Sequence, residues 1–354
     1  MCRAVVFTGD GGHEIREFPV PEPPDGGAVL QVEAVGLCGS DVAQHAGVHL
    51  IPGTSAFPVV PGHETVGRVW RLGRDAALGV SEGDRVAVDE VLSQQPPLAV
   101  YGYTMPVDGD RGLFGGYGEY MVVLPGTRLH RLRDDAPAAE LTVFEPMANA
   151  VNWVEIAGVR PGHTVVIEGP GHQGLAVLQA VLAADADSAI VTGAAGDGIR
   201  LDAARTIGAH EVIDVTATDA VARVRELTGG RMADVVMDIS PAVETVPLAL
   251  DLVAFRGTVL LAGLKHFAPV DGIVTDKIVV QGLRVLGGSG YTPGSMAQAV
   301  ELINTGAVDV RHLRGEVFGL DDIDEALGLL ARTIPGRDAV RVSLVHERTG
   351  QRGS

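Results

Sequence analysis

The feature that most constrains the fold is an alternation of short apolar strands and amphipathic helices from about residue 163 onward. Because parallel strands need helical crossovers, this alternation predicts an α/β domain with a doubly wound parallel sheet. The expected strands span 163–169, 189–192, 211–215, 233–239, 258–262 and 283–286, and the expected helices span 171–184, 199–207, 217–228 and 242–254.

The turn between the first strand and the first helix is rich in glycine. Residues 169–174 read Gly-Pro-Gly-His-Gln-Gly, a G-x-G-x-x-G pattern in which glycines permit a tight turn and close approach of a pyrophosphate. The alternative is a glycine-rich turn without a ligand, but the strand–turn–helix context favours dinucleotide binding. The expected cofactor contacts in this turn are Gly169, Gly171, His172, Gln173 and Gly174.

The end of the second strand of the series decides between NAD and NADP. A ribose-binding carboxylate is expected there, but Gly193 occupies the position and Asp197 follows in the loop. A 2′-phosphate needs a cation, and the nearest arginine, Arg200, falls in the next helix. Gly193, Asp197 and Arg200 are therefore further candidate cofactor contacts, and we expect NAD in preference to NADP.

The N-terminal part has a different pattern. Residues 1–150 are rich in Val, Gly and Pro, which predicts a β-rich barrel or sandwich with many turns. Residues 89–118 form a long irregular lobe, and the tail after 288 predicts two helices and a final strand. The strands expected here span 4–7, 28–35, 67–72, 84–88, 119–124 and 339–346, and the tail helices span 295–305 and 321–331.

Composition excludes several classes of function. A formal charge of −18 at pH 7, with only two lysines, argues against nucleic acid or a membrane surface as a partner. Two cysteines, Cys2 and Cys38, cannot form a disulfide framework. The N-terminal residues do not resemble a signal peptide, and the longest apolar run is too short to span a bilayer, so we expect a cytoplasmic protein.

Three short motifs contain potential metal ligands. Residues 61–67 read Pro-Gly-His-Glu-Thr-Val-Gly, so His63 and Glu64 follow a turn and precede a strand. Cys38 lies upstream between glycines, and Glu145 lies downstream before a proline. Cysteine, histidine and glutamate form a zinc-ligand set of the catalytic type, which keeps one coordination position open. Each motif alone is weak, because most His-Glu pairs are solvated surface residues.

Taken together, these motifs resemble the zinc-dependent medium-chain dehydrogenase/reductase family, most closely its polyol and threonine dehydrogenases. The resemblance covers nearly the whole chain and also includes the motifs at 83–86 and 118–120. It implies a GroES-like β-rich catalytic domain interrupted by a Rossmann domain, with the active site between them. The expected boundaries are 1–152 and 288–354 for the catalytic domain and 153–287 for the Rossmann domain.

The resemblance also implies roles for individual residues. Zinc would be held by Cys38, His63 and Glu145, with Glu64 as a fourth ligand at rest or as a neighbouring carboxylate that leaves the metal when substrate binds. Asp41 would hydrogen-bond His63, and Ser40 would take the proton of the alcohol while hydride passes to the nicotinamide. A homodimer or homotetramer is expected.

Two departures from the family pattern affect these expectations. The family's structural zinc needs four cysteines in the lobe 89–118, which has none, so we expect one catalytic zinc and no structural zinc. The relay histidine of many relatives is replaced by Ala43, and His45 is the candidate substitute. The principal hypothesis is oxidation of a secondary alcohol or polyol. The alternatives are an NAD(P)H-dependent reductase of carbonyls or activated alkenes and, in another class, a non-catalytic nucleotide-binding protein.

Overall fold

The computed structural model describes residues 1–48, 56–93 and 98–346, so part of the lobe 89–118 lies outside the described residues. The chain divides into two compact units. The first comprises Met1–Phe144 with the described residues from Arg314 onward, and the second comprises Glu145–Leu313. The domain boundaries after residues 152 and 287 remain predictions.

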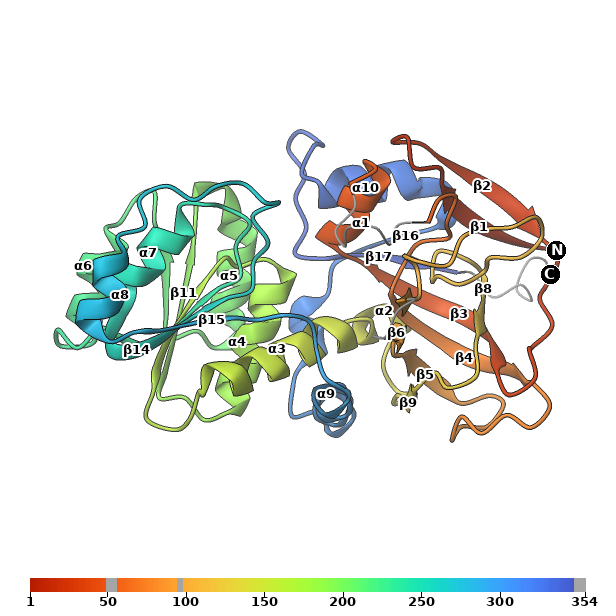
Figure 1. Ribbon diagram of the computed structural model, residues 1–354, viewed down its shortest axis with the longest axis horizontal. Helices are drawn as coiled ribbons and strands as arrows, with labels where there is room; N and C mark the ends of the chain where they lie inside the picture. Colours follow the sequence, from red (N-terminus) through yellow and green to blue (C-terminus); the bar gives the residue numbers. More distant parts are fainter. Residues whose placement is uncertain (49–55, 94–97, 347–354) are drawn as a thin grey trace. The chain divides into compact units, whose positions relative to one another are not determined.

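The first unit is built on a mainly antiparallel sheet. Its strands, among the described residues, follow the order β16-β17-β3-β4-β5-β9, and β8 also pairs with β3. The C-terminal strands drawn in blue therefore lie beside the red and orange N-terminal strands (Figure 1). The strands are β3 (Ala28–Leu37), β4 (Glu64–Leu72), β5 (Arg85–Val88), β8 (Tyr120–Val123), β9 (Leu129–Arg131), β16 (Glu316–Phe318) and β17 (Val342–Val345).

Shorter elements complete this unit. β1 (Cys2–Phe7) pairs with β2 (His13–Phe18), and β6 (Val91–Ser93) pairs with β7 (Ala99–Val100) in the lobe that the sequence left irregular. The helices are α1 (Gly39–His45), α2 (Ala138–Leu141) and α10 (Ile323–Leu330). Valine-rich strand faces and leucines of α10 form a buried core in which Phe7, Phe18 and Leu37 are fully covered. Strand-like alternation predicted β1, β3, β4, β5, β8 and β17 but missed β2, β9 and β16. Helices α1 and α2 were also not predicted.

The second unit contains the predicted parallel sheet. Its order among the described residues is β12-β11-β10-β13-β14-β15, and every pairing is parallel. This order reverses direction at β10, as a doubly wound sheet requires. The strands are β10 (Thr164–Glu168), β11 (Ser188–Gly193), β12 (Glu211–Asp214), β13 (Ala233–Asp238), β14 (Val253–Leu261) and β15 (Arg284–Gly287).

Helices flank this sheet on both sides (Figure 1). Local capping explains where two of them begin: Asp219 accepts a hydrogen bond from Ala222 N at the start of α6, and Thr292 accepts one from Ser295 N at the start of α9. The helices are α3 (Phe144–Ala157), α4 (His172–Ala183), α5 (Gly198–Ile207), α6 (Ala220–Leu227), α7 (Thr245–Leu252), α8 (Thr275–Gln281) and α9 (Pro293–Thr305).

The predicted fold class, a GroES-like unit combined with a Rossmann unit, is confirmed by this architecture. The sequence missed α3 and α8. The apolar residues of α8 face outward and give no core-facing pattern: Val279 is 77% exposed and Val280 is 76% exposed. Within the described residues, no helix combines the length and apolar character needed to cross a membrane.

Candidate functional site

Two neighbouring strands of the first unit bring Cys38 and His63 together. Cys38 directly follows β3 and caps α1, and His63 directly precedes β4. The strands are antiparallel with Gly36 opposite Glu64, so the end of one strand lies beside the start of the other. Ligand atoms of Cys38 and of His63 each lie within 4.8 Å of a Glu64 carboxylate oxygen, and the His63 side chain is buried. A thiol and an imidazole are therefore both close to the same carboxylate.

Glu64 is fully buried and forms an ion pair with Arg341, which is also buried. Arg341 Nη2 additionally donates to Thr142, at 2.9 Å from its carbonyl oxygen and 3.1 Å from Oγ1. Only glycine fits at position 36, because a Cβ atom there would overlap the ion pair. The other carboxylate oxygen, Glu64 Oε1, has no hydrogen-bond partner among the described residues. A buried oxygen in this state can accept a cation as its partner.

Ser40 and Asp41 lie on the first turn of α1, next to Cys38. Asp41 Oδ2 accepts a hydrogen bond from the Cys38 backbone at 2.8 Å, which caps the helix. Its other oxygen lies 3.6 Å from His63 Nδ1, longer than a hydrogen bond. Tyr103 is nearer: its hydroxyl lies 3.2 Å from His63 Nδ1 and donates to Ser40 Oγ at 2.8 Å.

The electrostatics of this cluster favour positive charge. Burial opposes protonation of His63, but Tyr103 and Asp41 outweigh burial and raise the pKa of His63 well above its ordinary value. Burial raises the pKa of Glu64, whereas Arg341 and His63 lower it. Burial also raises the pKa of Tyr103 well above its ordinary range, so its hydroxyl is a neutral hydrogen-bond donor at neutral pH.

His45, the candidate substitute for the relay histidine, lies at the C-terminal end of α1. Its Nε2 lies 3.1 Å from His13 Nδ1, and its ring packs edge-on against Phe7 with centroids 4.9 Å apart. Burial and the neighbouring His13 lower the pKa of His45. A role for His45 in proton transfer remains a prediction.

In the second unit, residues 169–174 form the turn between β10 and α4. Gly169 has φ of +98°, the left-handed region that favours glycine. A Cβ atom on Gly174 would overlap the carbonyl oxygen of Gly169, so the third glycine is needed for helix and strand to pack. A Cβ atom on Gly171 would meet no atom within 4 Å, and Gly171 caps α4 without a side-chain hydrogen bond. The turn therefore leaves a helix N-terminus accessible at Gly171.

The loop after β11 determines how Asp197 and Arg200 are arranged. β11 ends at Gly193, where a Cβ atom would lie 2.8 Å from the Pro170 ring. Asp197 Oδ2 accepts a hydrogen bond from Ala194 N at 3.0 Å, and its Oδ1 lies 3.7 Å from Arg200 Nη1. The Arg200 side chain is buried and its charge is paired with that of Asp197.

Glu145 lies in the first turn of α3, where Asn149 and Gln173 define its surroundings within the second unit. Asn149 Nδ2 donates to Glu145 Oε1 at 2.7 Å and lies 3.4 Å from Gln173 Oε1. Gln173 Nε2 donates to the Pro146 carbonyl oxygen at 2.8 Å. Gln173, a predicted cofactor contact, thus ties the dinucleotide turn to the helix that carries Glu145.

A second set of buried charges lies at the carboxyl end of the parallel sheet. Glu168 and Asp238 are register neighbours on β10 and β13, and both are fully buried. Asp238 pairs with Lys265 at 2.7 Å, whereas neither Glu168 oxygen has a hydrogen-bond partner among the described residues. Burial and the nearby Asp238 raise the pKa of Glu168 well above its ordinary value, which favours its protonated form.

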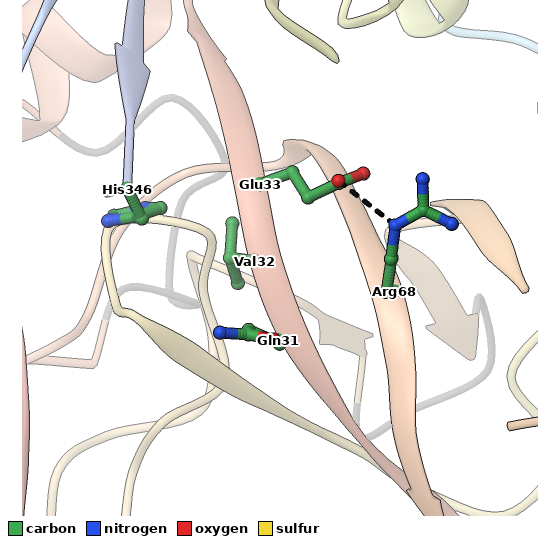
Figure 2. Close-up of a pocket in the computed structure, with 5 residues that line it drawn as sticks. All are labelled: Gln31, Val32, Glu33, Arg68 and His346. Atoms are coloured by element: carbon green, nitrogen blue, oxygen red, sulfur yellow. Dashed lines mark hydrogen bonds and ion pairs between the residues drawn. The ribbon is translucent and has the colours of Figure 1, made fainter. Parts of the chain in front are cut away.

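A separate hollow of about 320 Å³ lies over the middle of β3 and β4 in the first unit. Figure 2 shows Glu33 and Arg68 in contact with each other on one side of it, with His346 on the other side. Arg68 Nε lies 3.1 Å from Glu33 Oε1, and Arg68 Nη2 lies 2.7 Å from Asp134 Oδ1. Because two carboxylates neutralise its cation, this hollow does not have the charge of an anion site.

The sequence analysis missed Tyr103, Arg341 and Asn149. The sequence does contain one indication of the role of Arg341, because it is a charged residue at the start of an apolar strand. A charged side chain that is buried with such a strand needs a buried partner. For Asn149 the indication is that it lies four residues after Glu145 on a helix and so on the same face. Tyr103 lies in the lobe without periodicity, so sequence patterns gave no signal for it.

Comparisons with known proteins identify the family. Residues 24–134 match the model of the alcohol dehydrogenase GroES-like domain, and residues 174–305 match that of the zinc-binding dehydrogenase domain. The chain is 34% identical to a probable alcohol dehydrogenase of Mycobacterium tuberculosis, covering 94% of this chain and 95% of the relative. It is 30% identical to an erythritol/L-threitol dehydrogenase of Mycolicibacterium smegmatis, covering 97% of each.

Solved structures agree with this result. A zinc-binding dehydrogenase from Sinorhizobium meliloti, bound to NADP, has 25% identity and a TM-score of 0.85, covering 98% of this chain and 99% of that one. The 2R,3R-butanediol dehydrogenase of Bacillus subtilis shares the fold, with 23% identity and a TM-score of 0.86 over 98% of this chain and 100% of that one. The chain therefore belongs to the zinc-type alcohol dehydrogenase family of medium-chain dehydrogenases and is an oxidoreductase.

Proposed function

We propose that the protein is a zinc- and NAD(P)-dependent dehydrogenase of secondary alcohols or polyols, with one catalytic zinc per chain. The observation that carries the proposal is that Cys38 and His63 both lie within 4.8 Å of Glu64, whose buried Oε1 has no hydrogen-bond partner among the described residues. Sulfur, imidazole nitrogen and carboxylate oxygen suit Zn²⁺, and the buried acidic groups compensate its charge. The donor set present therefore fits the metal that the family uses.

Glu145 is proposed as the third ligand, and the covalent chain supports this. Thr142 is held by Arg341, the partner of Glu64, and Glu145 follows three residues later. Three residues of extended chain span at most about 11 Å, which limits the distance between the Thr142 and Glu145 backbones. Asn149 donates to one Glu145 oxygen, which orients the carboxylate in the way that neighbouring groups orient metal ligands.

Zinc, when bound, supplies a Lewis acid that acidifies the alcohol, and the nicotinamide supplies the hydride acceptor. The remaining work falls to side chains of this chain. Ser40 Oγ is proposed to take the proton of the alcohol while its own hydroxyl proton passes on toward the cofactor ribose, and the hydroxyl of Tyr103 holds that oxygen in place. Arg341 pairs with Glu64 in its buried position, which favours the charged carboxylate that a metal ligand would need.

NAD is proposed as the preferred cofactor. A 2′-phosphate would need a cation at the end of β11, and the charge of Arg200 is paired there with that of Asp197. The preference is tested by titrating the protein with each nucleotide in its reduced, fluorescent form. We expect a lower Kd for the NAD form than for the NADP form.

Self-association through the second unit is also proposed. β15 is the last strand of the parallel sheet, so one side of its backbone has no strand partner among the described residues. Exposed apolar residues lie on the neighbouring strand β14, where Phe255 is 67% exposed, and on α8, which precedes β15 and carries the outward-facing Val279 and Val280. A second copy of the chain, paired through the same strand, would cover this face symmetrically. Val280→Asp should shift the mass measured by light scattering toward the monomer.

The test of the proposed function is turnover by the zinc-loaded protein. Secondary alcohols and polyols are offered with NAD or NADP, and the corresponding ketones with the reduced cofactors. We expect oxidation of at least one alcohol, and Cys38→Ser should abolish it while leaving nucleotide binding intact. Faster reduction of carbonyls or activated alkenes would favour the reductase. A zinc-loaded, nucleotide-binding protein without turnover in either direction would contradict the proposal.

A further inference from the structure

We propose that Tyr103 is a positioning residue that aligns Ser40 and His63 through one shared hydroxyl. This inference rests on the proposed function, because it concerns the residues that would hold the metal and take the proton. Tyr103 lies in the lobe 89–118, far from both partners in sequence. Its hydroxyl lies 2.8 Å from Ser40 Oγ and 3.2 Å from His63 Nδ1, within hydrogen-bond distance of each.

The direction of the two hydrogen bonds follows from the donors available. A histidine that binds metal through Nε2 carries its hydrogen on Nδ1, so His63 would donate to the Tyr103 oxygen. Tyr103 then uses its own hydrogen toward Ser40 Oγ, as the geometry indicates. Ser40 therefore accepts from Tyr103, and its own hydrogen is left to face another group. One chain of bonds thus fixes both the His63 tautomer and the orientation of Ser40.

Asp41 is less suited to this role. One of its oxygens caps α1 through the Cys38 backbone, and the other lies 3.6 Å from His63 Nδ1. The Tyr103 ring also packs against the His63 ring, with centroids 5.1 Å apart, so the tyrosine restrains the imidazole by contact as well.

Tyr103→Phe tests the inference because it removes the hydroxyl and retains the ring. Tyr101→Phe is the matched control: its hydroxyl is buried in the same lobe but lies 2.7 Å from Thr127 Oγ1, away from the site. Zinc affinity is measured by competition with a chelator, and kcat and KM are measured with the best alcohol found. Urea unfolding of all variants establishes that they fold.

We expect Tyr103→Phe to lower zinc affinity and kcat by about tenfold or more, the usual effect of losing a group that orients a metal ligand. The KM for the nucleotide should stay unchanged, and Tyr101→Phe should alter neither zinc affinity nor kcat. Because Tyr103 acts through Ser40, the two substitutions should not be independent. Ser40→Ala should lower kcat by a smaller factor in the Tyr103→Phe variant than it does in the wild-type protein.

The inference is overturned if the zinc affinity and kcat of Tyr103→Phe are within twofold of those of Tyr101→Phe. It is also overturned if the loss of kcat in the double variant equals the product of the losses from Tyr103→Phe and Ser40→Ala alone. These outcomes differ from failure of the proposed function. If the wild-type protein oxidises no alcohol, the dehydrogenase assignment fails, whereas the zinc-affinity comparison between the two phenylalanine variants still decides the role of Tyr103.

Discussion

Arg341→Met would leave Glu64 as an uncompensated charge in the core of the first unit. Both side chains are almost fully buried, and the guanidinium also serves the Thr142 carbonyl and hydroxyl oxygens. Methionine retains much of the volume and removes the charge and all donors. The perturbation therefore isolates the electrostatic and hydrogen-bonding role of Arg341 from its packing.

The expected loss is about 3–5 kcal/mol in the free energy of unfolding, the usual cost of breaking a buried ion pair by removing one partner. In a unit of this size, that loss corresponds to a fall in Tm of roughly 6–20 °C. Adding Glu64→Gln removes the stranded charge and should restore at least about 2 kcal/mol, so the two substitutions should be strongly non-additive.

The assay is urea unfolding followed by tryptophan fluorescence. Trp70 lies on β4 in the same unit, whereas Trp153 lies on α3, so a Trp153→Phe background makes the signal specific to the first unit. Arg337→Met is the control, because Arg337 pairs with Glu316 and Glu325 at an exposed position and should cost less than about 1 kcal/mol. A loss for Arg341→Met equal to that of the control, or additivity with Glu64→Gln, would refute this reasoning.

Three further predictions concern the cofactor turn, the thiols and the buried acid. Gly171→Ala should weaken nucleotide binding at least tenfold in a fluorescence titration without changing urea stability, whereas Gly174→Ala should lower both, because only its Cβ atom overlaps backbone. Burial raises the pKa of Cys2 to about 11, so iodoacetamide at neutral pH should label Cys38 in metal-free protein and spare Cys2; equal labelling would contradict this. Because the folded pKa of Glu168 lies above its unfolded value, the stability it contributes is complete at low pH and is lost as pH rises through the folded pKa. Wild type should therefore lose urea stability relative to Glu168→Gln as pH rises, and an unchanged difference would contradict the assignment.

The strands of the second unit were predicted well, because the sequence patterns that specify them lie within short segments of the chain. Strand and helix periods, together with the glycine turn at 169–174, recur within short windows, and the observed strands match the expected ones to within a few residues. The strand alternation of the first unit also gave most of its sheet. Helix α8 was not predicted, because its valines face outward and hydrophobic periodicity identifies only helix faces that pack on a core.

The residues of the candidate site likewise fall into those that short sequence motifs predicted and those that they could not. Cys38 and His63 were predicted from short motifs, and the structure brings them together because β3 and β4 are antiparallel with a defined register. Tyr103 and Arg341 could not be found this way, because their partners are distant in sequence and no spacing rule connects them. The pairing of Asp197 with Arg200 likewise depends on how one loop folds.

Zinc content per chain tests the central claim most directly. Protein purified without chelator, loaded with excess zinc and freed of unbound metal, is analysed by mass spectrometry alongside Cys38→Ser and His63→Ala. The account predicts about one zinc per wild-type chain and close to none in either variant. Equal zinc in all three proteins, or none in wild type, would contradict it.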